Sequence, residues 1–123
     1  MGANLMGVNT KSNRELLAIR LKKVAEETDS KLWADIAERI RKPKDRLSEV
    51  NVGHISRFAK GGESVIVPGV VLGSGRVEEP IEVAALYFTK TARTKIEEAG
   101  GKTMTIDEML DRKLEASKIK IIG

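Results

Sequence analysis

The stretch Ser64–Phe88, "SVIVPGVVLGSGRVEEPIEVAALYF", decides the fold class of this 123-residue chain. It contains apolar runs rich in β-branched residues, and its last run, Ile81–Phe88, is almost continuously apolar. Such a run is typical of a strand that is covered on both faces. The pair Pro68-Gly69 is a turn signal, so we expect two short strands, Ser64–Val67 and Val70–Leu72, before the longer one.

Two amphipathic helices are expected before this stretch. Ser12 and Glu15 have the spacing of a capping box, with Ser12 as the N-cap of the first helix. The second helix must end before Pro43. The apolar residues that share one helical face are Leu17, Leu21, Val24 and Ala25 in the first helix and Trp33, Ile36, Ala37 and Ile40 in the second. Residues 1–11 are expected to form a loose arm.

Helices and strands are expected to alternate after Phe88. The expected elements are a helix over Thr89–Ala99, a strand over Thr103–Thr105, a helix from the capping box Thr105–Glu108 to about Leu114, and an edge strand over Ile119–Ile122. This order favours an α/β fold: a basic N-terminal helical part followed by a mixed α/β body with short strands and two helices. The length fits a single domain, whose helical part covers residues 1–62 and whose body covers residues 63–123.

Composition excludes several classes of protein. The chain has no cysteine, which excludes disulfides, thiolate metal sites and a cysteine nucleophile. No apolar run approaches the roughly 18 residues of a membrane span, and the N-terminus lacks the pattern of a signal peptide. Aromatic residues are scarce, which argues against a stacking platform for single-stranded nucleic acid. They are Trp33, Phe58, Tyr87 and Phe88.

The two glycines of "VLGSGR" (Val71–Arg76) raise the possibility of a phosphate-binding loop. A dinucleotide fingerprint needs a third glycine where Glu78 stands, and a helix where a strand is expected. A Walker loop is absent as well. We therefore interpret Gly73 and Gly75 as turn glycines. A small nucleotide-binding enzyme that uses the Gly73–Gly75 loop remains one alternative.

Other candidate chemistry is sparse. His54 is the only histidine, which weakens any metal site, and no nucleophile-elbow motif supports serine catalysis. Asp107 and Asp111 lie four residues apart on an expected helix and could hold Mg²⁺, although acids in a first turn also suit the helix dipole. No credible acid/base pair is evident, and none of these motifs gives firm support for a bound cofactor.

Positive charge is concentrated in the first half of the chain. Residues 1–60 carry 13 lysines and arginines against 8 acidic residues, whereas residues 61–123 carry 9 against 10. Five cations fall within eight residues, namely Arg39, Arg41, Lys42, Lys44 and Arg46. A helix C-terminus favours cations and explains the first two, but not the others. The cluster predicts contact with RNA or DNA phosphates. A helical DNA-binding or partner-binding module formed by Ser12–Arg41 is a second alternative.

Three stretches in order resemble a known family. They are "WADIAERIRKPKDRLSEVNV" (Trp33–Val52), "VIVPGVVLGSG" (Val65–Gly75) and "VAALYFTKTARTKIEEAGG" (Val83–Gly101). Together they resemble the archaeal and eukaryotic large-subunit ribosomal protein L-eighteen-e, a relative of bacterial ribosomal protein L-fifteen. The resemblance covers nearly the whole chain from about Asn4 onward. It implies a mixed α/β structural protein that binds large-subunit ribosomal RNA and has no catalytic role.

The resemblance also implies partners and binding residues. The family's basic positions fall on Arg41, Lys42, Lys44, Arg46, Arg57 and Arg76, whereas His54 and Val70 stand where the family usually has a basic residue. With the cations added from the charge pattern, the residues expected to bind RNA are Lys11, Arg14, Arg41, Lys42, Lys44, Arg46, Arg57, Lys60 and Arg76. The expected partners are large-subunit ribosomal RNA and neighbouring large-subunit proteins in the cytoplasm, with no membrane and no small-molecule substrate.

Overall fold

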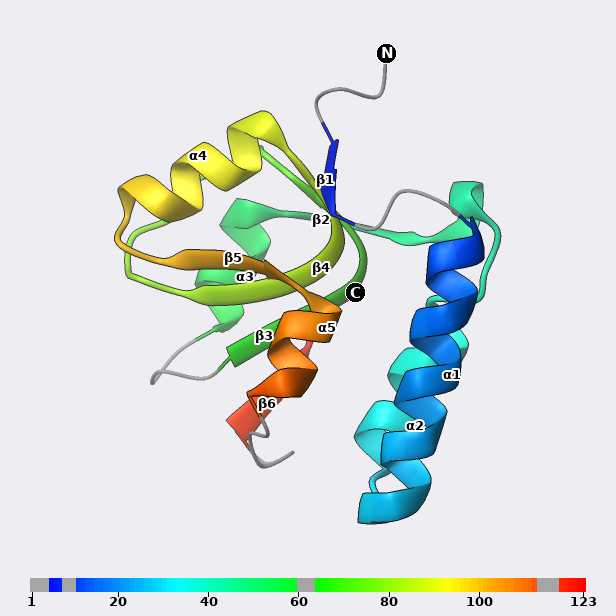
Figure 1. The fold of residues 1–123 in the computed structure, drawn as a ribbon. Helices are drawn as coiled ribbons and strands as arrows, with labels where there is room; N and C mark the ends of the chain where they lie inside the picture. The colour runs from blue at the N-terminus through cyan, green and yellow to red at the C-terminus, as the bar shows by residue number, and fades with distance from the viewer. Residues whose placement is uncertain (1–4, 8–10, 60–63, 113–117) are drawn as a thin grey trace.

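A computed structural model of the chain describes residues 5–7, 11–59, 64–112 and 118–123. Within these ranges a six-stranded sheet lies between helices (Figure 1), which confirms the mixed α/β fold. The helices are α1 (Lys11–Thr28), α2 (Lys31–Arg39), the 3₁₀ helix η2 (Lys44–Arg46), α3 (Val52–Phe58), α4 (Lys90–Glu98) and α5 (Ile106–Asp111). The strands are β1 (Leu5–Gly7), β2 (Ser48–Asn51), β3 (Ser64–Leu72), β4 (Glu82–Thr89), β5 (Lys102–Thr105) and β6 (Ile119–Ile121).

The sheet is built around the parallel pair β3 and β4. On the outer side of β4, β5 pairs in parallel with its first half and β1 pairs antiparallel with its last three residues. On the outer side of β3, β6 pairs with the first half and β2 with the second half, both in parallel. Parallel neighbours need crossover connections, and the helices supply them.

Helices cover both faces of the central pair (Figure 1). On one face, α1, α2 and α5 pack on side chains such as Ile66, Ala84 and Leu86. On the other face, α3 and α4 pack on side chains such as Val65 and Val83. The interior of β4 is therefore buried on both sides, as the apolar run Ile81–Phe88 predicted.

The apolar faces predicted for the first two helices are confirmed. Leu17 and Leu21 of α1 are buried, and so are Trp33 and Ile36 of α2. Because these faces pack against the sheet, α1 and α2 do not form an independent helical module.

The predicted boundary at the N-terminus is wrong in two respects. Helix α1 begins at Lys11 and already contains Ser12, so Ser12 is not its N-cap. Leu5–Gly7 form strand β1 beside β4, where a loose arm was expected. A strand of three residues is too short to show an apolar pattern. Its pairing partner, β4, lies about eighty residues later in the sequence, so no local signal predicted it.

The turn predicted at Pro68-Gly69 is also wrong. Strand β3 runs without interruption from Ser64 to Leu72, and its register against β4 shifts between Val67 and Val70. A shift of this kind accommodates a proline that cannot donate to the ladder. Gly69 pairs with Ser48 of β2, and a Cβ atom on Gly69 would lie 2.1 Å from the Ser48 carbonyl oxygen.

Besides β1 and the short helix η2, strand β2 and helix α3 were not expected from the sequence. Strand β2 has a single buried residue, Val50, and therefore lacks an apolar pattern. Helix α3 has the sequence "VGHISRF", which is poor in strong helix formers. Burial of Val52 and Ile55 against the sheet stabilises it instead.

The C-terminal elements follow the sequence closely. The Thr89 hydroxyl caps α4 by accepting from the Ala92 amide at 3.2 Å. Thr105 and Glu108 form the predicted capping box of α5. The strands expected near residues 103–105 and 119–122 are present as β5 and β6. Helix α5 ends at Asp111, and the expected end at Leu114 lies outside the described residues. No helix in the described ranges is long and apolar enough to cross a membrane.

The close approach of Gly69 to β2 gives a first prediction. Gly69→Ala should lower the free energy of unfolding by about 1–3 kcal/mol, because the added methyl group forces β2 away from β3. Urea denaturation measures this through the fluorescence of Trp33, the one tryptophan of the chain. Thr94→Ala, at an exposed position of α4, is the control and should change stability by less than about 0.5 kcal/mol. Equal stability of the two variants would contradict the account of β3.

A second prediction concerns Glu82 at the start of β4. Its Oε1 accepts hydrogen bonds from Arg112 Nη1 at 2.8 Å and from Ser64 Oγ at 3.2 Å. The bond from Arg112 lowers the pKa of the Glu82 carboxyl below its ordinary value. The stabilisation that the ionised Glu82 carboxylate gives to the folded state is therefore present above the unfolded-state pKa. It is lost as the pH falls through the lower folded-state pKa.

We expect Glu82→Gln to be less stable than the parent chain at pH 7, and the difference should shrink as the pH falls below the ordinary pKa of the carboxyl group. Urea denaturation at several pH values measures this. The control is Glu98→Gln, which changes an exposed carboxylate on α4. If Glu82→Gln lowers the free energy of unfolding by the same amount at pH 3 and at pH 7, the ion pair of Glu82 with Arg112 contributes nothing to stability.

Candidate nucleic-acid interface

Four of the five cations in the predicted cluster lie in one exposed segment between two buried anchors, whereas Arg39 belongs to α2 and pairs with Asp35. This segment, which we name the α2–β2 loop, comprises residues Arg41–Arg46. Ile40 before it and Leu47 after it are buried in the core, whereas every residue of the loop itself is exposed. The structure therefore brings Arg41, Lys42, Lys44 and Arg46 together on the surface.

Arg14 of α1 fastens this loop from beneath. The residue is only 7% exposed, and its Nη1 donates to the carbonyl oxygens of Ile40 at 3.2 Å and Lys42 at 2.7 Å. Carbonyls at a helix C-terminus have no partner within the helix, so the guanidinium satisfies groups that α2 leaves open. Arg14 was expected to bind RNA, and the structure places it where it positions the loop.

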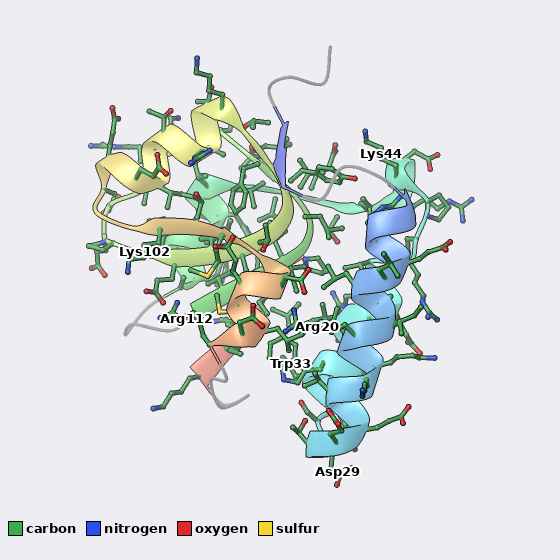
Figure 2. The ribbon with its side chains drawn as sticks, in the orientation of Figure 1. Arg20, Asp29, Trp33, Lys44, Lys102 and Arg112 are labelled. Carbon is green, nitrogen blue, oxygen red and sulfur yellow. The ribbon has the colours of Figure 1, made fainter. Side chains whose placement is uncertain are left out.

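Lys44 is tied to the sheet by an aromatic contact. Its Nζ lies 5.4 Å from the centroid of the buried Tyr87 ring in β4, within the range of a cation–π interaction. Figure 2 places Lys44 beside the N-terminal end of α1. The loop is thus held both by Arg14 and by Tyr87.

An open pocket of about 690 Å³ lies between α1 and this loop. Its walls combine apolar side chains, a single acid and several cations: Ile19, Ile40, Pro43, Glu15, Arg14, Arg41, Lys42 and Lys44. The excess of cations suits an anionic ligand.

A second pair of predicted cations meets on another part of the surface. Arg57 of α3 and Arg76 line one pocket of about 500 Å³, although they lie 19 residues apart in sequence. Glu78 and Glu79 line the same pocket, so its charge is mixed. The α2–β2 loop is therefore the stronger anion-binding candidate of the two.

The glycines of "VLGSGR" form a turn whose backbone is already engaged. Lys95 Nζ donates to the carbonyl oxygens of Gly73 at 2.6 Å and Gly75 at 2.8 Å. Ser74 accepts from the Gly53 amide and donates its own amide to Asn51. Gly75 has a φ of 94°, and a Cβ atom there would lie 2.6 Å from Gly53 Cα. A strand follows the turn, so the interpretation as turn glycines is confirmed.

The carboxylates proposed as Mg²⁺ ligands are paired with an arginine. Asp107 and Asp111 of α5 both accept from Arg20 of α1, which Figure 2 shows pointing toward α5. The hydrogen bonds to Asp111 and Asp107 raise the pKa of Arg20 above its ordinary value. Within the described ranges, no three metal-ligating side chains are grouped.

The single histidine and the last two predicted cations remain to be placed. His54 is exposed on α3, and its ring centroid lies 4.7 Å from that of Phe58. Lys11 is the first residue of α1, but its side chain is outside what the structure describes. Lys60 lies outside the described residues.

The role of Arg14 had a signal in the sequence that was missed. Arg14, Leu17 and Leu21 have the spacing i, i+3 and i+7, which places all three on the buried face of α1. The aromatic contact of Lys44 had no such signal, because Tyr87 lies more than forty residues away.

The different surroundings of two arginines give a third prediction. Arg14→Ala should lower the free energy of unfolding by about 1–3 kcal/mol, because it leaves carbonyls at the end of α2 without a donor. Arg41→Ala removes an exposed side chain and should change stability by less than about 0.5 kcal/mol. Urea denaturation followed by Trp33 fluorescence measures the stability of both variants. If Arg14→Ala is as stable as Arg41→Ala, Arg14 does not position the loop.

Comparison with known proteins identifies the family. Residues 7–122 match the family described as ribosomal protein 60S L18 and 50S L18e. The chain is 47% identical over 107 residues to large ribosomal subunit protein eL18 of Methanopyrus kandleri, covering 83% of this chain and 84% of that protein. It is 42% identical over 116 residues to the eL18 of Methanospirillum hungatei, covering 93% and 96%. The chain therefore belongs to the L18/L18e family of ribosomal proteins.

Proposed function

We propose that this chain is a structural constituent of the large ribosomal subunit in the cytoplasm, without catalytic activity, and that it binds folded large-subunit ribosomal RNA. Membership of the L18/L18e family supports the ribosomal role. One observation carries the RNA contact. The α2–β2 loop, which carries four exposed cations, is held by the hydrogen bonds of Arg14 to the Ile40 and Lys42 carbonyl oxygens and by the contact of Lys44 with Tyr87.

The proposed mechanism is electrostatic and geometric. Lysine and arginine side chains neutralise phosphates and release the counterions condensed on the RNA. Because the α2–β2 loop is anchored at both ends, less conformational entropy is lost when RNA orders it. Contacts to phosphates carry little base information, so recognition rests on the shape of the folded RNA and on its 2′-hydroxyl groups.

Arg57 and Arg76 form a second proposed phosphate contact. They line one pocket, but Glu78 and Glu79 lie there too and repel a phosphate that approaches from their side. We propose that the whole chain acts as one domain in these contacts, and that neighbouring large-subunit proteins are further partners. The names of its relatives, as proteins of that subunit, support the last point.

A fourth prediction tests the α2–β2 loop. Combined replacement of Arg41, Lys42, Lys44 and Arg46 by alanine should weaken binding to large-subunit ribosomal RNA. It should also make the dependence of log K on log salt shallower, by about 0.7–0.9 for each phosphate that the variant no longer neutralises. Fluorescence anisotropy at several salt concentrations measures both quantities.

The matched control removes the same charge elsewhere. Alanine at four exposed cations outside the loop, Lys22, Lys23, Lys31 and Lys90, gives the same change in net charge. The loop variant should lose clearly more affinity than this control while remaining folded, with only the small loss of stability expected from removing the contact of Lys44 with Tyr87. Equal losses in the two variants would mean that net charge, and no particular surface, attracts the RNA.

A further inference from the structure

One aromatic ring of this protein is left on the surface. Phe58, the last residue of α3, is 44% exposed, whereas Trp33, Tyr87 and Phe88 are buried. His54, one helical turn earlier, is exposed as well. The two ring centroids are 4.7 Å apart, with the ring planes inclined by 46°. Phe58 and His54, which we name the α3 aromatic pair, therefore form a small ring surface that faces solvent.

Positive charge lies directly beside this pair. Lys120 of β6 donates from Nζ to the Phe58 carbonyl oxygen at 3.0 Å, and the same Nζ is 5.9 Å from the centroid of the Phe58 ring. Arg57, next to Phe58 in sequence, is exposed too. The hydrogen bond fixes the lysine stem across the end of α3, so its charge is kept close to the ring.

We infer that the α3 aromatic pair is a stacking site for a single unpaired nucleobase of RNA, and that Lys120 and Arg57 contact the phosphates that flank this base. An RNA nucleotide presents an aromatic face and a negative charge within one unit, which matches a ring surface bordered by cations. A purely apolar partner would gain nothing from the neighbouring charges. The inference rests on the proposed function and adds the kind of RNA element that is bound.

The site would take one base and not a run of bases. Successive stacked bases need several exposed rings along a groove, and the other three aromatic side chains of the chain are buried. The scarcity of aromatic residues thus excludes an extended platform but leaves room for one base. The site also lies on the face of the sheet covered by α3 and α4, opposite the face on which α1 and α2 pack. RNA bound there would share Arg57 with the second proposed phosphate contact and would be separate from the α2–β2 loop.

The test uses the full chain and a single-stranded RNA oligonucleotide that carries 2-aminopurine, whose fluorescence falls when the base stacks. The parent chain should quench this probe at low salt and should quench the same sequence in a duplex much less. Phe58→Leu keeps an apolar side chain but removes the ring, and should weaken binding about tenfold. Phe58→Trp offers a larger ring and should retain binding, and Lys120→Gln should weaken it.

Controls separate folding, the site and the proposed function. Thermal unfolding by circular dichroism shows whether each variant is folded. If Phe58→Leu does not fold, Phe58→Trp still tests whether a ring at this position supports binding. Phe58→Leu with parental affinity would overturn the stacking site, as would absence of quenching by the parent chain. If Phe58→Leu weakens only its incorporation into large subunits and not RNA affinity, the ring contacts protein and the inference is wrong. The α2–β2 loop variant tests the proposed function independently, because it leaves Phe58 unchanged.

Discussion

The parallel pair β3 and β4 is apolar on both faces, and covering those faces determines where every other element lies. Exposure of either face would leave a row of valine, isoleucine and leucine side chains in water, at a cost of about 25 cal/mol per Å² of apolar surface. Helices α1, α2 and α5 cover one face, and α3 and α4 cover the other (Figure 1). The remaining strands are short because they occupy only half of an edge each.

This arrangement explains why charge gathers in the connections. Both faces of the sheet are filled by apolar side chains, so cations find room on outer helix surfaces and in the segments that pass between layers. The α2–β2 loop is such a segment, since it leads from a helix that covers one face to the edge of the sheet beside β3. Arg14 and Tyr87 restrict the loop, and exposed cations in a restricted loop can match a fixed arrangement of phosphates.

The sequence was informative where the signal is local and less so where it depends on distant contacts. Apolar periodicity predicted α1, α2 and β4, and the capping box predicted the start of α5. Pro68-Gly69 was misinterpreted as a turn, because the residue that pairs with Gly69 and continues the strand there is Ser48, 21 residues earlier in the chain. Strand β2 was missed since only Val50 is buried in it. In the interface, exposed cations were predictable, whereas the burial of Arg14 depended on the face of α1 on which it lies.

On this account, the α2–β2 loop contacts RNA when the protein is part of the large ribosomal subunit. Lysine acetylation followed by mass spectrometry, on the free protein and on intact large subunits, measures this directly. Lys42 and Lys44 are exposed in the free chain and should react readily. In the subunit they should lose reactivity, and they should regain it after ribonuclease digestion. If Lys42 and Lys44 react equally in the free protein and in the subunit, the α2–β2 loop does not contact RNA there.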